Sequence, residues 1–301
     1  MNPVLIRHLY QYTRKNRFFW LLSLYLLFVA LISAIFITLS GATYFFNSQI
    51  NPSMQDIYMA GRILYWFSSI ILIFAAALLA PTNALSLLSS ERENRTLDLL
   101  RTTSLNASTI VWGKLLSALL SGGVYVLAPL PLLMLGFWVG GVSLAELLLL
   151  AGFLIITMIA STSVALYLSA HSRRTITAVL IFYGVNFALL PLVGILSGVM
   201  VVLVDLWRNS NVMAQPFWIE AVIQYGWVIL AGFHPLTASI SSQALWTEQG
   251  SWGLLDFSVT RGRLLGTVVL PSPWITYTVL SLLLAILLMR RTIRQLGRPE
   301  K

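Results

Sequence analysis

Cysteine is absent from this sequence of 301 residues, and charge is scarce. Without cysteine, neither a disulfide framework nor a thiolate metal site can form. The three histidines are too scattered in the sequence to predict a metal cluster, so no metal site is expected. Charged residues make up only 10% of the chain, against about 25% in a soluble domain. Hydrophobic residues account for 58% and the mean hydropathy is +0.83, so the composition predicts a protein of the lipid bilayer.

Six stretches are apolar over about 20 residues, the length of helix that crosses the hydrocarbon core. They cover residues 18–39, 63–80, 110–135, 147–168, 175–204 and 273–291. The first is too long and too bulky for the apolar region of a cleaved signal peptide, so we expect it to remain as a span. The predicted fold class is all-α integral membrane, with six transmembrane helices in a single domain of residues 1–301.

The N-terminal residues 1–17 are amphipathic in a helical reading, which predicts an interfacial helix on the membrane surface. A disordered basic segment is the alternative.

Lysine and arginine are distributed unevenly among the segments that flank the spans. If the N-terminus is cytoplasmic, 15 of the 19 fall on the inner side. The positive-inside rule therefore predicts a multi-pass protein of the plasma (inner) membrane with both termini in the cytoplasm. This topology and contact with anionic membrane lipid account for the net charge of +9, and no nucleic-acid partner is expected.

The longest segment predicted to lie outside is 205–272. Within it, residues 216–233 are apolar, but this stretch is short and includes Glu220 and Gln224. A charge at mid-membrane costs at least about 2.5 kcal/mol on insertion scales, and a seventh crossing would carry the basic C-terminus outside. We therefore expect a short interfacial or re-entrant helix there.

The loop predicted between the second and third spans, 89–106, is rich in charged residues compared with most of the chain. Seven of the 29 charged residues lie in this loop or just beyond it. Ser90 and Glu93 have the spacing of a capping box, and Glu91 and Arg95 have the i to i+4 spacing of an ion pair. These patterns predict a short, charged helix at the cytoplasmic surface.

The second half of this loop adds an apolar side. Asp98 and Arg101 have an i to i+3 ion-pair spacing, and Leu97 and Leu100 line one side. Such pairs stabilise a helix by only about 0.2 to 0.5 kcal/mol each, so stability is a poor reason for them. Two interpretations stay open: a docking surface for another protein, or a solvated loop that only fixes the topology.

The stretch SERENRTLDLLRTTSLNASTIVWGKLL resembles the inner loop and third-span start of membrane subunits of type-2 ATP-binding-cassette (ABC) exporters. That family shows a run of acidic and basic residues, then Gly-Thr-Leu, an acidic residue, a leucine-rich turn, Thr-Pro-Leu-Ser and a later Gly-Lys. The matching positions are Glu91, Arg92, Glu93, Thr96, Leu97, Asp98, Leu99, Leu100, Thr103, Leu105, Gly113 and Lys114. NPVLIRHLYQYTRKNR and HPLTASIS are similar to two further stretches of the family. Arg95 stands at the usual glycine and Ser104 at the usual proline, so we expect the inner helix to run on further than in relatives.

The resemblance implies a permease that works as a homodimer or heterodimer, with two ABC ATPase subunits on the cytoplasmic side. The implied coupling helix comprises Ser90, Glu91, Arg92, Glu93, Arg95, Thr96, Leu97, Asp98, Leu99 and Leu100. No G-x-x-x-x-G-K-[ST] loop is present, and Gly113 and Lys114 open an apolar helix instead of following a strand. The chain is therefore expected to be no enzyme and to hold no cofactor, while ATP and Mg²⁺ bind to the partner ATPase.

Polar features inside the spans are few. Tyr183 and Asn186 in the fifth span are candidates for the translocation path, with an interhelical hydrogen bond as the alternative. Pro129 and Pro131 predict a kink in the third span.

The positions of the ionisable residues bear on two other functions, an ion-coupled carrier and a membrane enzyme. No such residue lies at mid-span, which argues against an ion-coupled carrier. No histidine accompanies the inner carboxylates, which argues against a membrane enzyme. A regulatory, immunity or mechanical role of the ATPase complex without export stays open.

Overall fold

The fold comes from a computed structural model, which describes residues 16–47, 54–96, 106–138, 140–209, 217–250, 253–261 and 264–297. The chain divides into two compact units. Unit 1 comprises Met1–Phe182 and Leu284–Lys301, and unit 2 comprises Tyr183–Leu283. Two long helices, α9 (Thr175–Asn209) and α12 (Pro273–Leu296), contribute to both units. Of the interfacial helix predicted at 1–17, residues 1–15 lie outside the described residues.

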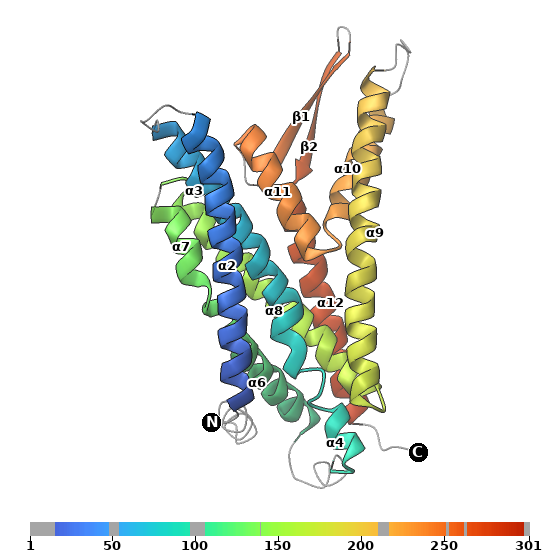
Figure 1. Cartoon of the computed structure of the whole chain (residues 1–301). Coiled ribbons are helices and arrows are strands. Elements are labelled where there is room, and N and C mark those ends of the chain that lie inside the picture. Colours follow the sequence, from blue (N-terminus) through green and yellow to red (C-terminus); the bar gives the residue numbers. More distant parts are fainter. Residues whose placement is uncertain are drawn as a thin grey trace. The chain divides into compact units, whose positions relative to one another are not determined.

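Helices make up the regular structure described in unit 1 (Figure 1). They are α2 (Asn16–Asn47), α3 (Met54–Phe74), a π-helical segment (Ala75–Leu79), a 3₁₀ segment (Ala80–Asn83), α4 (Ser89–Glu93), α6 (Ala107–Leu127), α7 (Leu130–Trp138), α8 (Leu144–His171), the start of α9 and the end of α12. α3 packs against α2, α7 and α8, while α6 packs against α8 and the π-helical and 3₁₀ segments. The second span, which runs through α3 and these two segments, is therefore the central element of unit 1.

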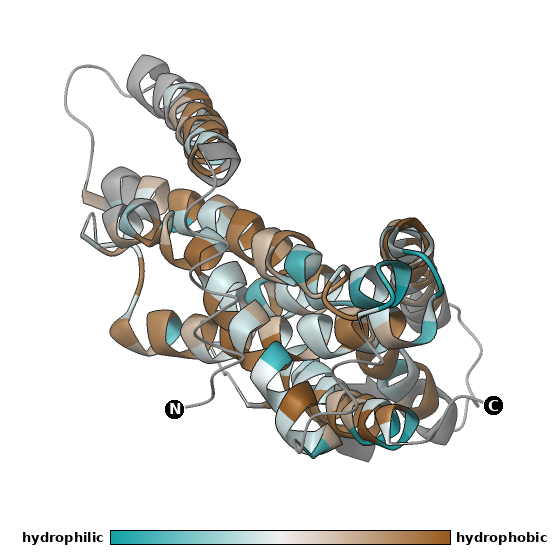
Figure 2. Cartoon of the chain, turned by 90° about the horizontal axis from the view of Figure 1, so that it is seen from below, coloured by the Kyte–Doolittle hydropathy of each residue, from teal (hydrophilic) through white to brown (hydrophobic). Residues whose placement is uncertain are grey.

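The prediction of an all-α membrane fold is confirmed. In the described part of the chain, five helices are long and apolar enough to cross a membrane: Tyr58–Asn83, Ala107–Leu127, Leu144–His171, Thr175–Leu203 and Pro273–Leu296. Large apolar side chains remain exposed along these helices, and brown, hydrophobic residues occur along the helices in Figure 2, as a lipid environment requires. The first predicted span falls within α2, whose apolar part in the described residues is the shorter Leu22–Ile35, so the count of six is not confirmed.

The second span changes its helix type before its C-terminal end. A π-helical turn over Ala75–Leu79 is followed by the 3₁₀ turn Ala80–Asn83. Pro81 contributes to this change because it has no N–H to donate to the carbonyls of the preceding turn. The Ala76 carbonyl instead accepts a hydrogen bond of 2.9 Å from Ser161 Oγ on α8. The alanines of the π turn are buried, and their small side chains let α6 and α8 approach its backbone.

Gly122 on α6 marks the closest approach to this segment. A methyl group at Gly122 would lie 2.3 Å from the Ala80 carbonyl oxygen. At the next residue, Gly123, it would meet Met158 Cε at 3.8 Å, an ordinary contact. Glycine at position 122 therefore sets how near α6 lies to the 3₁₀ turn.

The third span is broken by more than the predicted kink. α6 ends at Leu127, and α7 begins at Leu130, after a turn that contains Pro129. Pro129 lacks the N–H that would continue α6. The apolar crossing in the structure therefore ends at Leu127 instead of residue 135, and α7 packs against α3.

Unit 2 holds most of α9, then α10 (Phe217–Ala231), α11 (Pro235–Gln249), the strands β1 (Leu254–Arg261) and β2 (Leu264–Pro271), and the start of α12. The strands form an antiparallel ribbon, which packs on α10. Val228, Leu245 and Leu270, from α10, α11 and β2, form a small buried cluster. Where one short helix was expected in 205–272, the described residues thus contain two complete helices and a ribbon; their position relative to a membrane stays a prediction.

His234 starts α11 in this unit. Its Nδ1 accepts a hydrogen bond of 3.3 Å from the Leu236 N–H, so the unprotonated imidazole caps the helix. Pro235 follows at the first turn, where a missing N–H has no cost. Burial lowers the pKa of His234 to about 4, which keeps the imidazole neutral.

Candidate functional site

The predicted coupling loop begins with α4, at the end of unit 1 where α2 starts and α12 finishes (Figure 1). Ser89 Oγ donates to the Leu85 carbonyl at 2.9 Å, and Ser90 Oγ donates to the Ser86 carbonyl. Serine hydroxyls commonly bond to nearby backbone in this way. The N-cap position is Leu88, with no side-chain cap. The prediction that Ser90 caps this helix is therefore wrong, because its hydroxyl bonds to the preceding turn.

α4 ends at Glu93, and Arg95 takes the conformation that stops it. Its φ is 55°, in the left-handed region where a helix usually ends on glycine. The Arg95 N–H donates to the Arg92 carbonyl at 3.1 Å and the Thr96 N–H to the Glu91 carbonyl at 2.9 Å, the two bonds of a Schellman motif. The expectation that the helix runs on past Arg95 is wrong. The arginine adopts the glycine-like conformation at a strain of about 1 to 2 kcal/mol.

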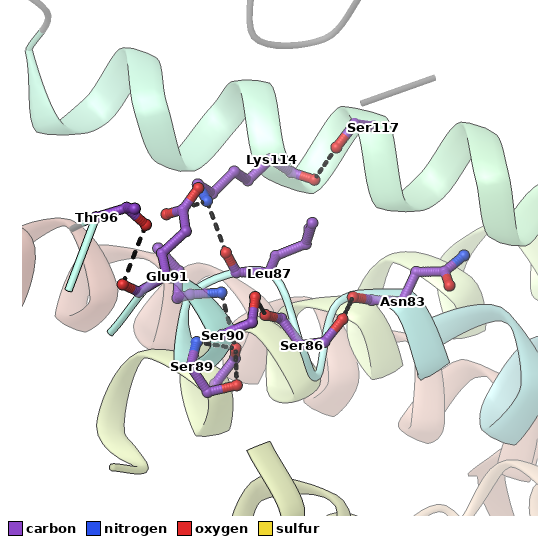
Figure 3. A network of polar contacts seen from close by, with 11 residues as sticks. Asn83, Ser86, Leu87, Ser89, Ser90, Glu91, Thr96, Lys114 and Ser117 are labelled. Atoms are coloured by element: carbon purple, nitrogen blue, oxygen red, sulfur yellow. Dashed lines mark hydrogen bonds and ion pairs between the residues drawn. The ribbon is translucent and has the colours of Figure 1, made fainter. Parts of the chain in front are cut away.

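Glu91 is held by a buried lysine and not by Arg95 (Figure 3). Glu91 Oε2 lies 2.6 Å from Lys114 Nζ near the start of α6, and the two side chains are 18% and 0% exposed. The same ammonium donates to the Leu87 carbonyl at 2.7 Å. The predicted pair of Glu91 with Arg95 is therefore wrong. A buried ammonium needs a counter-charge far more than an exposed guanidinium does.

The other side of α4 is bound to the end of α8. Ser169 Oγ accepts hydrogen bonds of 3.0 Å from the backbone N–H groups of both Leu88 and Ser89. The hydroxyls of Ser89 and Thr175 lie 2.9 Å apart. These bonds satisfy N–H groups that the first turn of a helix otherwise leaves free.

The next residues of α4 reach the turn between α8 and α9. Arg92 Nη1 donates to the carbonyl of Ser172, the C-cap residue of α8, at 3.0 Å. Glu93 Oε1 accepts a bond of 2.6 Å from the Thr175 N–H, where α9 begins. Each charge lies at the helix end whose dipole favours it, the cation at a C-terminus and the anion at an N-terminus. α4 is thus joined to α6 on one side and to the α8–α9 turn on the other.

Six of the predicted coupling residues fall in the described part of the chain: Ser90, Glu91, Arg92, Glu93, Arg95 and Thr96. Glu91 and Arg92 are half-buried in contacts with unit 1, whereas residues 93–96 are exposed. Leu97, Asp98, Leu99 and Leu100 lie outside the described residues. The exposed part of this segment therefore starts at the end of α4.

Tyr183 and Asn186 do not belong to this cluster. Both lie on the part of α9 in unit 2 and are half-buried, and the Tyr183 ring stacks on Phe187 with centroids 6.4 Å apart. Their role in a translocation path stays a prediction.

Sequence reasoning missed the residues that hold α4: Lys114, Ser169, Ser172 and Thr175. For Lys114 a signal was present, because a lone lysine among the apolar residues of a span indicates a buried partner. The serines and Thr175 gave no signal, since they act through backbone groups distant in sequence. Within the described residues, no group of three or more histidine, cysteine, aspartate or glutamate side chains could hold a metal ion. The contacts at α4 hold it in place against α6, α8 and the start of α9.

Comparison with known proteins agrees with this architecture. A search of curated proteins finds no match. The family described as "ABC-2 family transporter protein" matches residues 5–242, which begin before α2 and end within α11, and leaves the ribbon and α12 outside the match. Because the match includes α4 and extends over well more than half of the sequence, the chain belongs to the ABC-2 transporter family and is a permease subunit of that type.

Proposed function

We propose that this permease subunit serves an ATP-driven exporter and that the loop beginning with α4 docks a separate ATPase subunit. Membership of the ABC-2 family supports the transport role. The observation that carries the coupling role is the double attachment of α4. An ion pair joins it to α6, and hydrogen bonds join it to the α8–α9 turn. A segment attached in this way transmits one displacement to several spans.

The docking surface consists of the exposed end of α4 and the residues that follow. Central apolar side chains usually carry most of the energy of such a contact, while charges at the rim set orientation and association rate. We assign the central role to Leu97 and Leu100 and the rim to Glu93 and Arg95, which are exposed. Glu91 is half-buried against Lys114 and is not assigned to the rim, whereas Glu93 stays exposed while its carboxylate caps α9.

The remaining features of the proposal concern the assembly. The chain pairs with a second permease subunit, contacts lipid, and leaves ATP and Mg²⁺ to the ATPase. The start of α2, α4 and the end of α12 lie at one end of unit 1, which agrees with cytoplasmic termini in the plasma (inner) membrane (Figure 1). The translocation path passes Tyr183 and Asn186 on α9.

The test is purification of the tagged chain from native membranes, with mass spectrometry of the bound subunits. Changing Leu97 and Leu100 together to Asp should weaken ATPase binding by about 2 kcal/mol or more, as expected of central contact residues. Ser210→Asp, in the segment predicted to lie outside, is the matched control.

Membrane insertion of the double variant should be normal, because the loop lies outside the hydrocarbon. If this variant reaches the membrane and binds and couples the ATPase as the unchanged chain does, the loop is only a topology signal.

A further inference from the structure

Lys114 has no exposed surface, which is unusual for a lysine near the start of an apolar span. Taking an ammonium and a carboxylate out of water is costly. A buried ion pair therefore adds little stability compared with apolar residues of the same size. The best-attested use of such a pair is to fix the register of two elements.

The geometry around the ammonium has the form that such a role requires (Figure 3). Lys114 Nζ contacts Glu91 Oε2 at 2.6 Å and the Leu87 carbonyl at 2.7 Å. Leu87 lies just before α4 and Glu91 lies within it, so the two contacts hold both the entry and the middle of this short helix. α4 itself packs on α8, and the long side chain of Lys114 makes its link to α6.

We propose that Lys114 is the positioning residue through which a displacement of α4 moves α6. This inference rests on the proposed function and names the side chain that carries the movement into the third span. The bonds from Ser169 to the backbone of α4 do not involve Lys114. Removing the ammonium therefore breaks the ion pair between α6 and α4 but leaves α4 attached to α8.

Three variants separate charge from packing: Lys114→Met, Glu91→Gln and the two changes together. Methionine keeps most of the length of the lysine side chain. The double variant leaves no lone buried charge, so it remains informative if a single variant fails to fold. Arg294→Met, which removes an exposed cation in the last turn of α12, is the matched control.

The first measurement uses the chain alone in lipid vesicles. Because the chain has no cysteine, spin labels can be placed at cysteines introduced for Asn94, Ser108 and Thr177, which are exposed on or beside α4, α6 and α9. We expect Lys114→Met to broaden the distance distribution between labels 94 and 108. The distribution between labels 94 and 177 should stay narrow. If neither distribution changes, or if both broaden equally, the proposal is overturned.

The second measurement uses the complex with its co-purified ATPase. Lys114→Met and the double variant should retain the ATPase but lower the stimulation of ATP hydrolysis by the permease at least about fivefold, the lower end of typical allosteric coupling. Arg294→Met should leave it unchanged. Full stimulation in the double variant would show that the charge is not required and would overturn the proposal. If no ATPase accompanies even the unchanged chain, the proposed function fails, and the label distances alone decide the role of Lys114.

Discussion

Gly122 gives the sharpest test of the packing around the second span, because its neighbour Gly123 provides a control on the same turn of α6. In Gly122→Ala, the new methyl group would lie 2.3 Å from the oxygen and 2.9 Å from both the carbonyl carbon and the Cα of Ala80. All three atoms belong to the backbone, so no flexible side chain can move aside. In Gly123→Ala, the methyl group would meet Met158 Cε at 3.8 Å.

The size of the effect follows from this difference. An ordinary contact begins at 3.4 Å, so α6 must move about 1 Å away from the 3₁₀ turn to accept alanine at Gly122. Overpacking of this kind costs about 1 to 3 kcal/mol. Alanine also favours the helix by about 1 kcal/mol over glycine, but this gain is common to both variants. The free energy of unfolding should therefore be lower in Gly122→Ala than in Gly123→Ala by about 1 to 3 kcal/mol.

The assay is thermal unfolding of the two purified variants in the same detergent. One kcal/mol corresponds to about 2 to 4 °C in a chain of 150 to 250 residues, so the two melting temperatures should differ by several degrees. Gly123→Ala should melt at or slightly above the unchanged chain. If Gly122→Ala melts as high as Gly123→Ala, the close approach of α6 to Ala80 is wrong.

Three further predictions concern other parts of the chain. Arg95→Gly should remove the left-handed strain after α4 and raise the melting temperature, whereas Arg95→Val should lower it; the reverse order would contradict the Schellman ending. The pKa of His234 is lowered from 6.5 to about 4 in the fold, so its stabilising contribution is complete above pH 6.5 and is lost as the pH falls toward 4. His234→Asn keeps a side-chain oxygen that can cap the helix, but it removes the titrating group, so the melting temperature should depend less on pH across this range. If the melting temperature falls with pH as steeply as in the unchanged chain, His234 is not the cause of the pH dependence. An impermeant thiol reagent on sealed cells should label Ser210→Cys but not Gly297→Cys, and the opposite pattern would reverse the topology.

Five of the six predicted spans correspond to helices long enough and apolar enough to cross a membrane, because hydropathy is a property of each stretch by itself. Their interruptions were harder to predict. Pro129 was recognised as a disturbance, but whether a proline bends a helix or ends it depends on what the following residues pack against, and here α7 packs on α3. The ribbon had a local signal, since Gly262 and Arg263 separate two runs rich in branched residues, the pattern of a two-residue hairpin. The ribbon was not predicted because its two runs are apolar and were not separated from the rest of the segment 205–272.

The role of the candidate site stays a prediction, and the contacts of its described residues were predicted from the wrong neighbours. Local spacing paired Glu91 with Arg95, because residues four apart share a face of a helix. The fold instead brings Lys114 from the next span to Glu91. Likewise, the position of Glu93 suggested a cap for its own helix, and its carboxylate caps α9 at Thr175. Rules that depend on sequence separation cannot identify partners that only tertiary packing brings together.

The π turn at Ala75–Leu79 affects where the second span can lose a residue without losing its packing. A single π turn behaves as one additional residue accommodated within an α-helix, so the helix faces before and after it keep their alignment. Loss of one alanine from this run should let the turn relax to an α-helix while α3 and the turn before α4 keep their own neighbours. The same loss within α6 would rotate all later residues by about 100°, the angle per residue of an α-helix, and would turn Lys114 or Gly122 away from its partner. The alanine run is therefore where we expect a one-residue deletion to be tolerated within the second span.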